Sequence, residues 1–357
     1  MTDAPPEDSR ELVRKIKRWG GELGFQQVGI TDTDLVDAEQ HLQNWLRKGF
    51  HGGMSYMQRH GSKRSRPEQL LPGTISVISA RMDYLPEGRE QIREVLADPV
   101  TAFISRYALG RDYHKLMRKR LQMLADRIQA EIGPFGYRAF VDSAPVLEKA
   151  LAEKAGLGWI GKHSNVIARR HGSWFFLGEI YTDLPLPADT PASNHCGSCH
   201  ACMDICPTRA IVAPYQVDAR LCISYLTIEL QGVIPVSLRP SLGNRIYGCD
   251  DCQLVCPWNR FAHLTAEKDF SPRHNLDSRQ LLELFAWTER QFLDFTAGSA
   301  IRRIGHQRWL RNIAVALGNA PASMAVRTAL RQRLGDVSDL VREHIQWALD
   351  RQEEKLR

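Results

Sequence analysis

The feature that most constrains this chain is the placement of its cysteines. All eight lie between Cys196 and Cys256, although the chain has 357 residues. The first run reads Cys196-x2-Cys199-x2-Cys202-x3-Cys206-Pro207. This is the spacing of bacterial ferredoxins, in which three thiolates hold one 4Fe-4S cluster and the fourth reaches a second cluster. The segment therefore predicts an electron-transferring metal module.

A second run repeats the pattern without its first cysteine. It reads Cys249-x2-Cys252-x3-Cys256-Pro257, and Ile246 stands where the missing ligand belongs. Cys222 is the only cysteine left over, so it would complete a set of eight ligands. With the crossing-over of two-cluster ferredoxins, we expect two quartets. One quartet is Cys196, Cys199, Cys202 and Cys256, and the other is Cys206, Cys222, Cys249 and Cys252.

A zinc site or a pair of disulfides is the alternative for these cysteines. Zinc knuckles lack a quartet that ends in Cys-Pro, and disulfides are rare in the cytosol. The first fifteen residues, MTDAPPEDSRELVRK, have no apolar core of the kind that a signal peptide needs. No apolar run approaches the length of a membrane-spanning helix. We therefore expect a cytoplasmic protein without membrane contact.

Three domains are expected from length and pattern, because 357 residues exceed the usual size of one hydrophobic core. Before residue 185 the periodicity predicts helices and strands in alternation, which indicates an α/β domain. The expected helices are 9–22, 37–48, 112–132 and 146–155, and the expected strands are 25–30, 74–84, 137–141, 164–166 and 173–181.

Two further domains follow the proline-rich segment DLPLPADTPASN. We place the domain boundaries at 1–185, 186–265 and 266–357. Residues 276–357 read as helical, and the stretches WLRNIAVALGNA and LVREHIQWAL resemble the two helices of a HEAT-like repeat. A generic helical bundle is the alternative for this tail.

Asp142 is the catalytic candidate. It follows the expected strand 137–141 and precedes an expected helix, the edge at which open α/β sheets bind ligands. Its neighbours in Phe140-Val-Asp-Ser-Ala-Pro are mostly apolar, and desolvation would raise the pKa of its carboxyl group toward neutrality. The alternative is a helix N-cap. His114 and His163 are isolated histidines, which are more often hydrogen-bonded residues than ligands.

The tail carries a positively charged segment. No Asp or Glu occurs from Phe295 to Gly335. Arginines there interleave with apolar residues, which predicts a helix that packs on one side and contacts phosphates on the other. The predicted nucleic-acid contacts are Arg302, Arg303, Arg308 and Arg311. A plain solvated surface is the alternative, although such surfaces usually carry both signs of charge.

Several long motifs together resemble one known family. They are VDSAPVLEKALAEKAGLGWIGK, CGSCHACMDICPTRAI, CISYLTIEL, GNRIYGCDDCQLVCPWN and IRRIGHQRWLRN. Their order and content are similar to those of the epoxyqueuosine reductases, over nearly the whole chain. The resemblance implies an oxidoreductase that removes the epoxide oxygen of epoxyqueuosine at the wobble position of tRNA, the last step of queuosine biosynthesis.

The resemblance also implies a fold and cofactors. The fold would be an α/β cobalamin-binding domain of the reductive-dehalogenase kind, a ferredoxin-like domain with two 4Fe-4S clusters, and a C-terminal HEAT-like domain. Cobalamin is implied by the resemblance alone. The family's proton-donating aspartate matches Asp142, and all eight cysteines match cluster ligands. Contacts to the corrin would fall near Arg64, Ser105, Asp142, His163, Ser224 and Asp250.

The expected mechanism sends electrons from an external low-potential donor through both clusters to cobalt, while Asp142 protonates the departing oxygen. The arginine segment would hold the anticodon stem-loop of a tRNA, and we expect the protein to be a monomer. One rival function is a cobalamin-dependent reductive dehalogenase of a small organic substrate. A non-enzymatic electron carrier is another, although it would leave the N-terminal domain without a task.

Overall fold

The computed structural model describes residues 7–357, and its centre is a four-stranded sheet. The strands are β1 (Gln27–Thr31), β2 (Ser76–Asp83), β3 (Phe103–Ile104), β4 (Tyr137–Phe140), β5 (Trp159–Ile160), β6 (Val166–Ile167), β7 (Phe175–Thr182), β8 (Ile211–Ala213), β9 (Gln216–Val217) and β10 (Arg245–Tyr247). The sheet has the order β1-β2-β7-β4, and β2 and β7 are buried along their whole length. β7 is rich in aromatic and β-branched residues, and β2 contributes Val77 and Ile78, which favours this central position.

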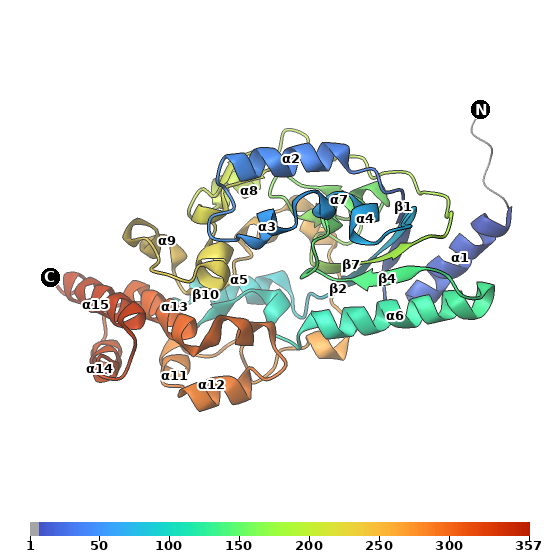
Figure 1. The fold of residues 1–357 in the computed structure, drawn as a ribbon. Helices are drawn as coiled ribbons and strands as arrows, with labels where there is room; N and C mark the ends of the chain where they lie inside the picture. The colour runs from blue at the N-terminus through green and yellow to red at the C-terminus, as the bar shows by residue number, and fades with distance from the viewer. Residues whose placement is uncertain (1–6) are drawn as a thin grey trace.

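Helices cover both faces of this sheet. The helices of this part of the chain are α1 (Glu7–Glu22), α2 (Val36–Arg47), α3 (Tyr56–Arg59), α4 (Pro67–Leu70), α5 (Arg89–Ala97), α6 (Tyr113–Ile132) and α7 (Glu148–Lys154). In Figure 1, α1 and α6 lie together along one face, and α7 lies across the other. Each helix and strand expected before residue 185 is present, with bounds shifted by a few residues.

The argument that placed Asp142 at a ligand-binding sheet edge is wrong for this sheet. All three strand pairings in it are antiparallel, so the carboxyl ends of the strands do not gather at one edge. Asp142 is also no helix cap, because α7 begins at Glu148 and its N-cap position is Leu147. The position of Asp142 must therefore be judged from its contacts.

The cysteine-bearing segment is built from short elements. They are α8 (Ala201–Ile205), α9 (Arg239–Leu242), α10 (Asp251–Leu254), β8 to β10, and the short turns η3 (Ala219–Leu221), η4 (Tyr225–Glu229), η5 (Val236–Leu238) and η6 (Pro257–Phe261). Strand β10 pairs in parallel with β3, which comes from the N-terminal part of the chain. The cysteine module and the sheet domain are thus joined by backbone hydrogen bonds.

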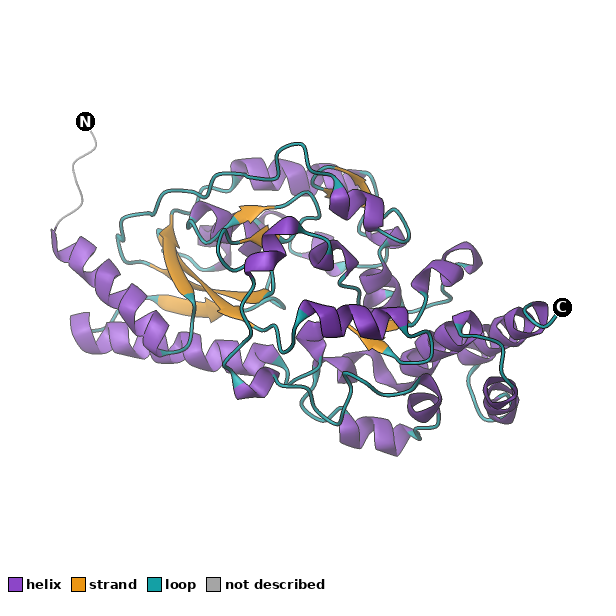
Figure 2. Cartoon of the chain, turned by 180° about the vertical axis from the view of Figure 1, so that it is seen from behind, coloured by secondary structure: helices purple, strands orange, loops and turns teal. Residues whose placement is uncertain are grey.

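The C-terminal part is helical, as expected. It contains α11 (Leu281–Phe285), α12 (Glu289–Phe295), the turn η8 (Ala300–Ile304), α13 (Gly305–Asn319), α14 (Met324–Arg333) and α15 (Asp339–Glu354). Figure 2 shows these helices at the opposite end of the molecule from the sheet. Within residues 7–357, no helix combines the length and the apolar character that crossing a membrane requires.

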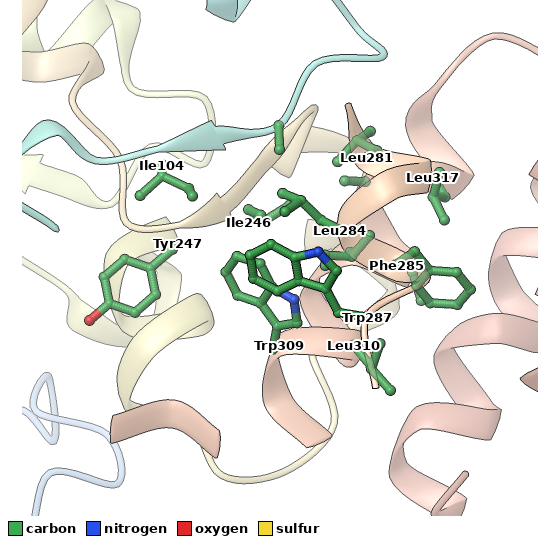
Figure 3. Close-up of a cluster of buried hydrophobic side chains, with 14 of the residues drawn as sticks. Ile104, Ile246, Tyr247, Leu281, Leu284, Phe285, Trp287, Trp309, Leu310 and Leu317 are labelled. Atoms are coloured by element: carbon green, nitrogen blue, oxygen red, sulfur yellow. The ribbon is translucent and has the colours of Figure 1, made fainter. Parts of the chain in front are cut away.

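One hydrophobic core crosses the expected domain boundaries. In Figure 3, Trp287 and Trp309 of the tail pack beside Ile246 of the cysteine module, and Ile104 of β3 belongs to the same cluster. The two indole rings are stacked at 5.8 Å between centroids. Trp309 is fully buried and so belongs to the core. The boundaries at 185 and 265 stay a prediction, but these residues tie the three parts into one packed unit.

Candidate functional site

Two cavities divide the eight cysteines between them. The first has a volume of about 350 Å³ and the second about 240 Å³. The first is lined by Cys206, Cys222, Cys249 and Cys252, and the second by Cys196, Cys199, Cys202 and Cys256. These sets have the same members as the quartets expected from the spacing. The second run lacks one cysteine of the ferredoxin pattern. The fold brings Cys222, which follows η3, to the quartet that this gap would leave incomplete.

The thiols within each set are close enough to influence one another. Burial, and then the neighbouring Cys256, Cys196 and Cys199, raise the pKa of the Cys202 thiol to about 11. Burial also raises the pKa of Cys252 well above its usual value, and Cys222 and Cys206 add to the effect. Four neighbouring thiols do not ionise together without a compensating positive charge. Each set is therefore chemically suited to an iron-sulfur cluster, which supplies that charge.

Asp142 lies on the wall of the first cavity, together with Tyr113. The Tyr113 hydroxyl donates a hydrogen bond of 2.5 Å to Asp142 Oδ2, and His114 Nε2 lies 3.1 Å from the same oxygen. The side chain of Asp142 keeps 47% of its surface exposed. Its backbone φ is +37°, which is unusual for a residue other than glycine. Such strain is typical of functional loops.

A chain of charged groups connects Asp142 to the tail. His114 Nδ1 lies 2.7 Å from Asp112 Oδ1, and Arg303 of η8 donates to Asp112 Oδ2 at 2.8 Å. Although burial opposes it, contact with these two carboxylates raises the pKa of His114. Burial likewise favours a neutral Asp112, but the hydrogen bonds from His114 and the charge of Arg303 lower the pKa of Asp112 to about 2. His114 thus lies between two carboxylates, and both favour its protonated form.

The same contacts overturn the expected pKa of Asp142. Desolvation does act to raise it, as the sequence argument held, but the hydrogen bonds from His114 and Tyr113 outweigh desolvation. The pKa of Asp142 is consequently lowered, and its carboxyl group is ionised at neutral pH. The local sequence could not reveal this, because the helix that carries both donors is far away in the sequence.

Five of the six expected cofactor contacts line the first cavity. They are Ser105, Asp142, His163, Ser224 and Asp250. Arg64 is not among the lining residues; its Nη2 donates to the carbonyl oxygen of Tyr56. Ser105 donates its hydroxyl proton to Asp250 Oδ1 at 2.6 Å, so these two side chains hold each other in place.

His163 stands out among these residues because it lines both cavities. It is only 4% exposed, and its Nε2 has no hydrogen-bond partner among residues 7–357. Its Nδ1 accepts the amide proton of Asn165. Burial, and then the charge of Lys149, lower the pKa of His163 to about 4, so the ring is neutral and Nε2 carries a proton. An unpaired buried donor of this kind is suited to a polar group of a bound cofactor.

The four predicted tRNA-contacting arginines have different environments. Arg302 and Arg303 are exposed, and Arg308 is half-buried and donates to three backbone carbonyl oxygens. Arg311 is fully buried. Its guanidinium donates to the carbonyl oxygens of Leu226, Leu230 and Gly232, so the prediction that it contacts phosphates is wrong. Sequence periodicity did not distinguish a buried arginine from an exposed one.

Three side chains of this region were not singled out from the sequence. Tyr113 begins α6, Glu148 lines the first cavity from the first turn of α7, and Glu179 is fully buried in β7. Glu179 is the one with a detectable signal. It is a lone acid inside the apolar run SWFFLGEIY, and acidic residues are almost never fully buried without a reason.

Comparison with known proteins identifies the family models that match the chain. A family described as "Epoxyqueuosine reductase QueG, DUF1730" matches residues 64–143. A "4Fe-4S double cluster binding domain" matches residues 195–259, which contain all eight cysteines.

Close relatives and solved structures extend the similarity over the whole chain. The epoxyqueuosine reductase of Pseudomonas aeruginosa is 64% identical over 98% of this chain and 96% of its own length. That of Escherichia coli is 61% identical over 98% and 92%. A solved epoxyqueuosine reductase with an epoxyqueuosine-modified tRNA-Tyr stem loop has a TM-score of 0.88 and 27% identity, covering 96% of this chain and 91% of that one.

A second solved structure is also similar over most of the chain. It is an epoxyqueuosine reductase from Bacillus subtilis, described with an aspartate-bearing catalytic loop swung out of its active site. Its TM-score is 0.86 at 27% identity, over 96% of this chain and 91% of that one. Identity above 60% along nearly the full length, with both family models in place, leads to one conclusion. This chain belongs to the epoxyqueuosine reductase family.

Proposed function

We propose that this protein reduces epoxyqueuosine to queuosine at the wobble position of tRNA, the last step of queuosine biosynthesis. One observation carries the proposal: a single cavity is lined both by a cysteine quartet and by Asp142. A redox group and a proton-carrying group thus meet in one place, which is what removal of an oxygen atom as water requires. The curated relatives and the tRNA-bound neighbour support the substrate.

The two quartets fit two 4Fe-4S clusters. The cluster in the second cavity would be held by Cys196, Cys199, Cys202 and Cys256, and the cluster in the first by Cys206, Cys222, Cys249 and Cys252. Such clusters exchange single electrons. Cys199 is the one exposed cysteine of the eight, although Cys202 and Cys256 of the same quartet are buried, so we place the electron-accepting end at the second cavity. An external low-potential donor would deliver electrons there.

The lining of the first cavity offers polar side chains to a further cofactor, and we propose cobalamin. The unpaired Nε2 of His163 and the Ser224 hydroxyl are available to it, and the Ser105–Asp250 pair shapes the adjoining wall. Arg64 does not line this cavity, so it would contact the cofactor only where the cofactor extends beyond the cavity. When bound, cobalamin supplies a low-valent cobalt ion that can break carbon–oxygen bonds.

The chain itself positions protons for this reaction. Asp142 would hold a proton at Oδ1 and pass it to the epoxide oxygen, while Tyr113 and His114 orient the carboxyl group through Oδ2. Two electrons and two protons convert that oxygen into water. The catalytic loop described for the Bacillus subtilis relative is consistent with a mobile, strained Asp142 loop here.

The exposed arginines would hold the RNA. Arg303 pairs with Asp112, and Asp112 contacts His114. The exposed arginines therefore lie beside the acid–base groups of the cavity. We propose that Arg302, Arg303 and the accessible edge of Arg308 contact phosphates of the anticodon stem-loop, so that a flipped wobble base reaches Asp142. A small organic substrate would need no such surface, and no contact described above favours the dehalogenase alternative.

Several finer assignments belong to the same proposal. Helices α13 and α15 pack against each other, and we interpret them as a HEAT-like pair. Residues 1–185, 186–265 and 266–357 would form the catalytic, ferredoxin-like and tRNA-binding parts. We further propose that the protein acts as a monomer in the cytoplasm, where its tRNA substrate is found.

A genetic experiment tests the proposal. Wobble nucleosides from cells that lack this protein should contain epoxyqueuosine in place of queuosine, as measured by mass spectrometry. Wild-type protein should restore queuosine, whereas an Asp142→Asn variant should not, although it should retain iron-sulfur and corrin absorption and bind the stem-loop. Unchanged queuosine in the deletion strain would refute the function, and full rescue by Asp142→Asn would remove this residue from the mechanism.

A further inference from the structure

The cysteine quartet of the second cavity meets solvent within basic surroundings. The residues that line this cavity come from three segments, 162–167, 195–202 and 256–261, and none of these lining residues is an Asp or Glu. Lys162 and Arg260 are the Lys and Arg residues of the lining. Cys199 is exposed, as are all but one of the residues from 193 to 200.

Lys162 lies against the backbone of the quartet. Its Nζ donates to the carbonyl oxygen of Gly197 at 2.7 Å and to that of Cys199 at 2.8 Å. Four thiolates give a bound cluster a net negative charge, which a nearby ammonium group offsets. Lys162 therefore serves the cysteine site itself, and the positive charge farther out needs another reason.

Three arginines carry the positive charge beyond the quartet. Arg169 and Arg170 are exposed in the turn that ends at Gly172, and Gly172 packs so closely against Asn259 that a Cβ atom would overlap its side chain. Arg260 follows Asn259 directly and is also exposed. Among residues 7–357, none of the three arginines has a salt-bridge partner. They are thus available to an anionic partner.

Exposed aromatic side chains lie among these charges. Phe261 is 38% exposed, and the guanidinium of Arg260 stacks on it at 4.6 Å from the ring centroid. Tyr215 is 46% exposed; its amide donates to the carbonyl oxygen of Lys162, and its hydroxyl accepts a hydrogen bond from Asn194. The backbone φ of Tyr215 is +67°, a strained value that is typical of functional surfaces. Aromatic groups within a charged rim are common where proteins bind one another.

We propose that this surface docks the electron donor, and that the donor is a small carrier protein with an acidic surface. We call it the Cys199 face, and it consists of Lys162, Arg169, Arg170, Cys199, Tyr215, Arg260 and Phe261. One electron leaves the reduced carrier, which is thereby oxidised, and enters the cluster site beside Cys199; no bond forms or breaks. Opposite charges speed such an encounter. The inference rests on the proposed function, because that reaction needs electrons from outside the chain.

RNA is the other polyanion that a basic surface attracts. The wobble base must reach Asp142, which lines the first cavity and not the second. The proposed RNA contacts Arg302 and Arg303 belong to η8, in the C-terminal part of the chain. An acidic carrier, in contrast, explains why the unpaired arginines lie near the one exposed cysteine. RNA binding to the Cys199 face is therefore an outcome that the experiment must be able to detect.

The test uses the complete, cofactor-loaded protein, with a flavodoxin as the probe because flavodoxins are acidic one-electron carriers. The variants are Arg260→Glu and the double variant Arg169→Glu/Arg170→Glu. Arg118→Glu is the matched control, because Arg118 is exposed on α6, which covers the face of the sheet opposite α7. Surface plasmon resonance measures flavodoxin binding at several salt concentrations. Stopped-flow absorbance follows cluster reduction by reduced flavodoxin and, separately, by reduced methyl viologen, a small cation.

We expect each variant of the Cys199 face to bind flavodoxin about tenfold more weakly at low salt and to accept its electrons more slowly by a similar factor. Added salt should shrink both differences, because it screens exposed charges. Reduction by methyl viologen should not slow, since arginines do not attract a cation. Arg118→Glu should behave as the wild type, and all variants should bind the stem-loop equally well.

Three results would overturn the inference. The first is variants of the Cys199 face that bind flavodoxin and accept its electrons like the wild type. The second is a wild-type rate with flavodoxin that does not fall as salt is added. The third is a loss of stem-loop affinity in place of flavodoxin affinity, which would assign the face to RNA.

A variant with a damaged cysteine module would also be reduced slowly by methyl viologen, and the salt series on the wild-type protein then decides. Failure of the proposed function is distinguishable from failure of this inference. Flavodoxin binding and cluster reduction are measured without tRNA, whereas unchanged queuosine in the deletion strain would refute the proposed function alone.

Discussion

Replacing Arg311 with alanine should lower the free energy of unfolding and leave the contacts to RNA unchanged. The guanidinium is fully buried and donates to three backbone carbonyl oxygens, of Leu226, Leu230 and Gly232, and also to Asn312 Oδ1. These carbonyls belong to η4 and the loop after it, so Arg311 attaches the tail to the cysteine module. The substitution would therefore loosen the junction of these two parts.

The magnitude follows from the acceptors left behind. A buried acceptor that loses its partner costs about 1–3 kcal/mol. The bond to Leu226 is buried, whereas those to Leu230 and Gly232 are partly buried, so water can replace them at lower cost. Burying the guanidinium is itself unfavourable, as the lowering of the Arg311 pKa to about 9 by burial indicates. We therefore expect a net loss of about 3 kcal/mol in the free energy of unfolding.

Urea denaturation followed by circular dichroism measures this loss, and stem-loop binding at several salt concentrations supplies the contrast. Arg302→Ala is the matched variant: it should leave the unfolding free energy within about 0.5 kcal/mol and reduce the salt slope of binding by roughly 1. An Arg311→Ala variant of wild-type stability that binds RNA as weakly as Arg302→Ala would refute the reasoning.

Further predictions concern protonation and metal content. Contact with Asp112 and Asp142 raises the pKa of His114 above 6.5, so its stabilising effect is complete below that pH and is lost as the pH rises through the raised value. The difference in Tm between wild type and His114→Gln should shrink over this interval, and a constant difference would contradict it. Cys222→Ser should lower the content of iron and inorganic sulfide in anaerobically purified protein by up to about half, since it would leave one quartet incomplete. If metal content and cluster absorption stay at the wild-type level, Cys222 is no cluster ligand.

The sequence was informative wherever chemistry depends on local spacing. The Cys-Pro-terminated runs and the count of eight were enough to predict two quartets, and the two cavities contain the same sets. Periodicity located the main helices and strands before residue 185, because burial of one face leaves a regular pattern, but it missed α5 and the shorter α3, α4, β3 and β5. The family followed from long motifs and is confirmed by relatives more than 60% identical.

Contacts between segments that are distant in the chain could not be predicted from the sequence. Apolar neighbours at 140–146 indicated a raised pKa for Asp142, whereas Tyr113 and His114, almost thirty residues earlier, lower it. Arg302 and Arg311 look alike in the sequence, yet one is exposed and the other is enclosed by η4 and the loop that follows it. The sequence thus determined the two cysteine sets, the main elements and the family, which depend on spacing. Tertiary structure decided charge states and exposure, because these depend on which distant groups share one low-dielectric environment.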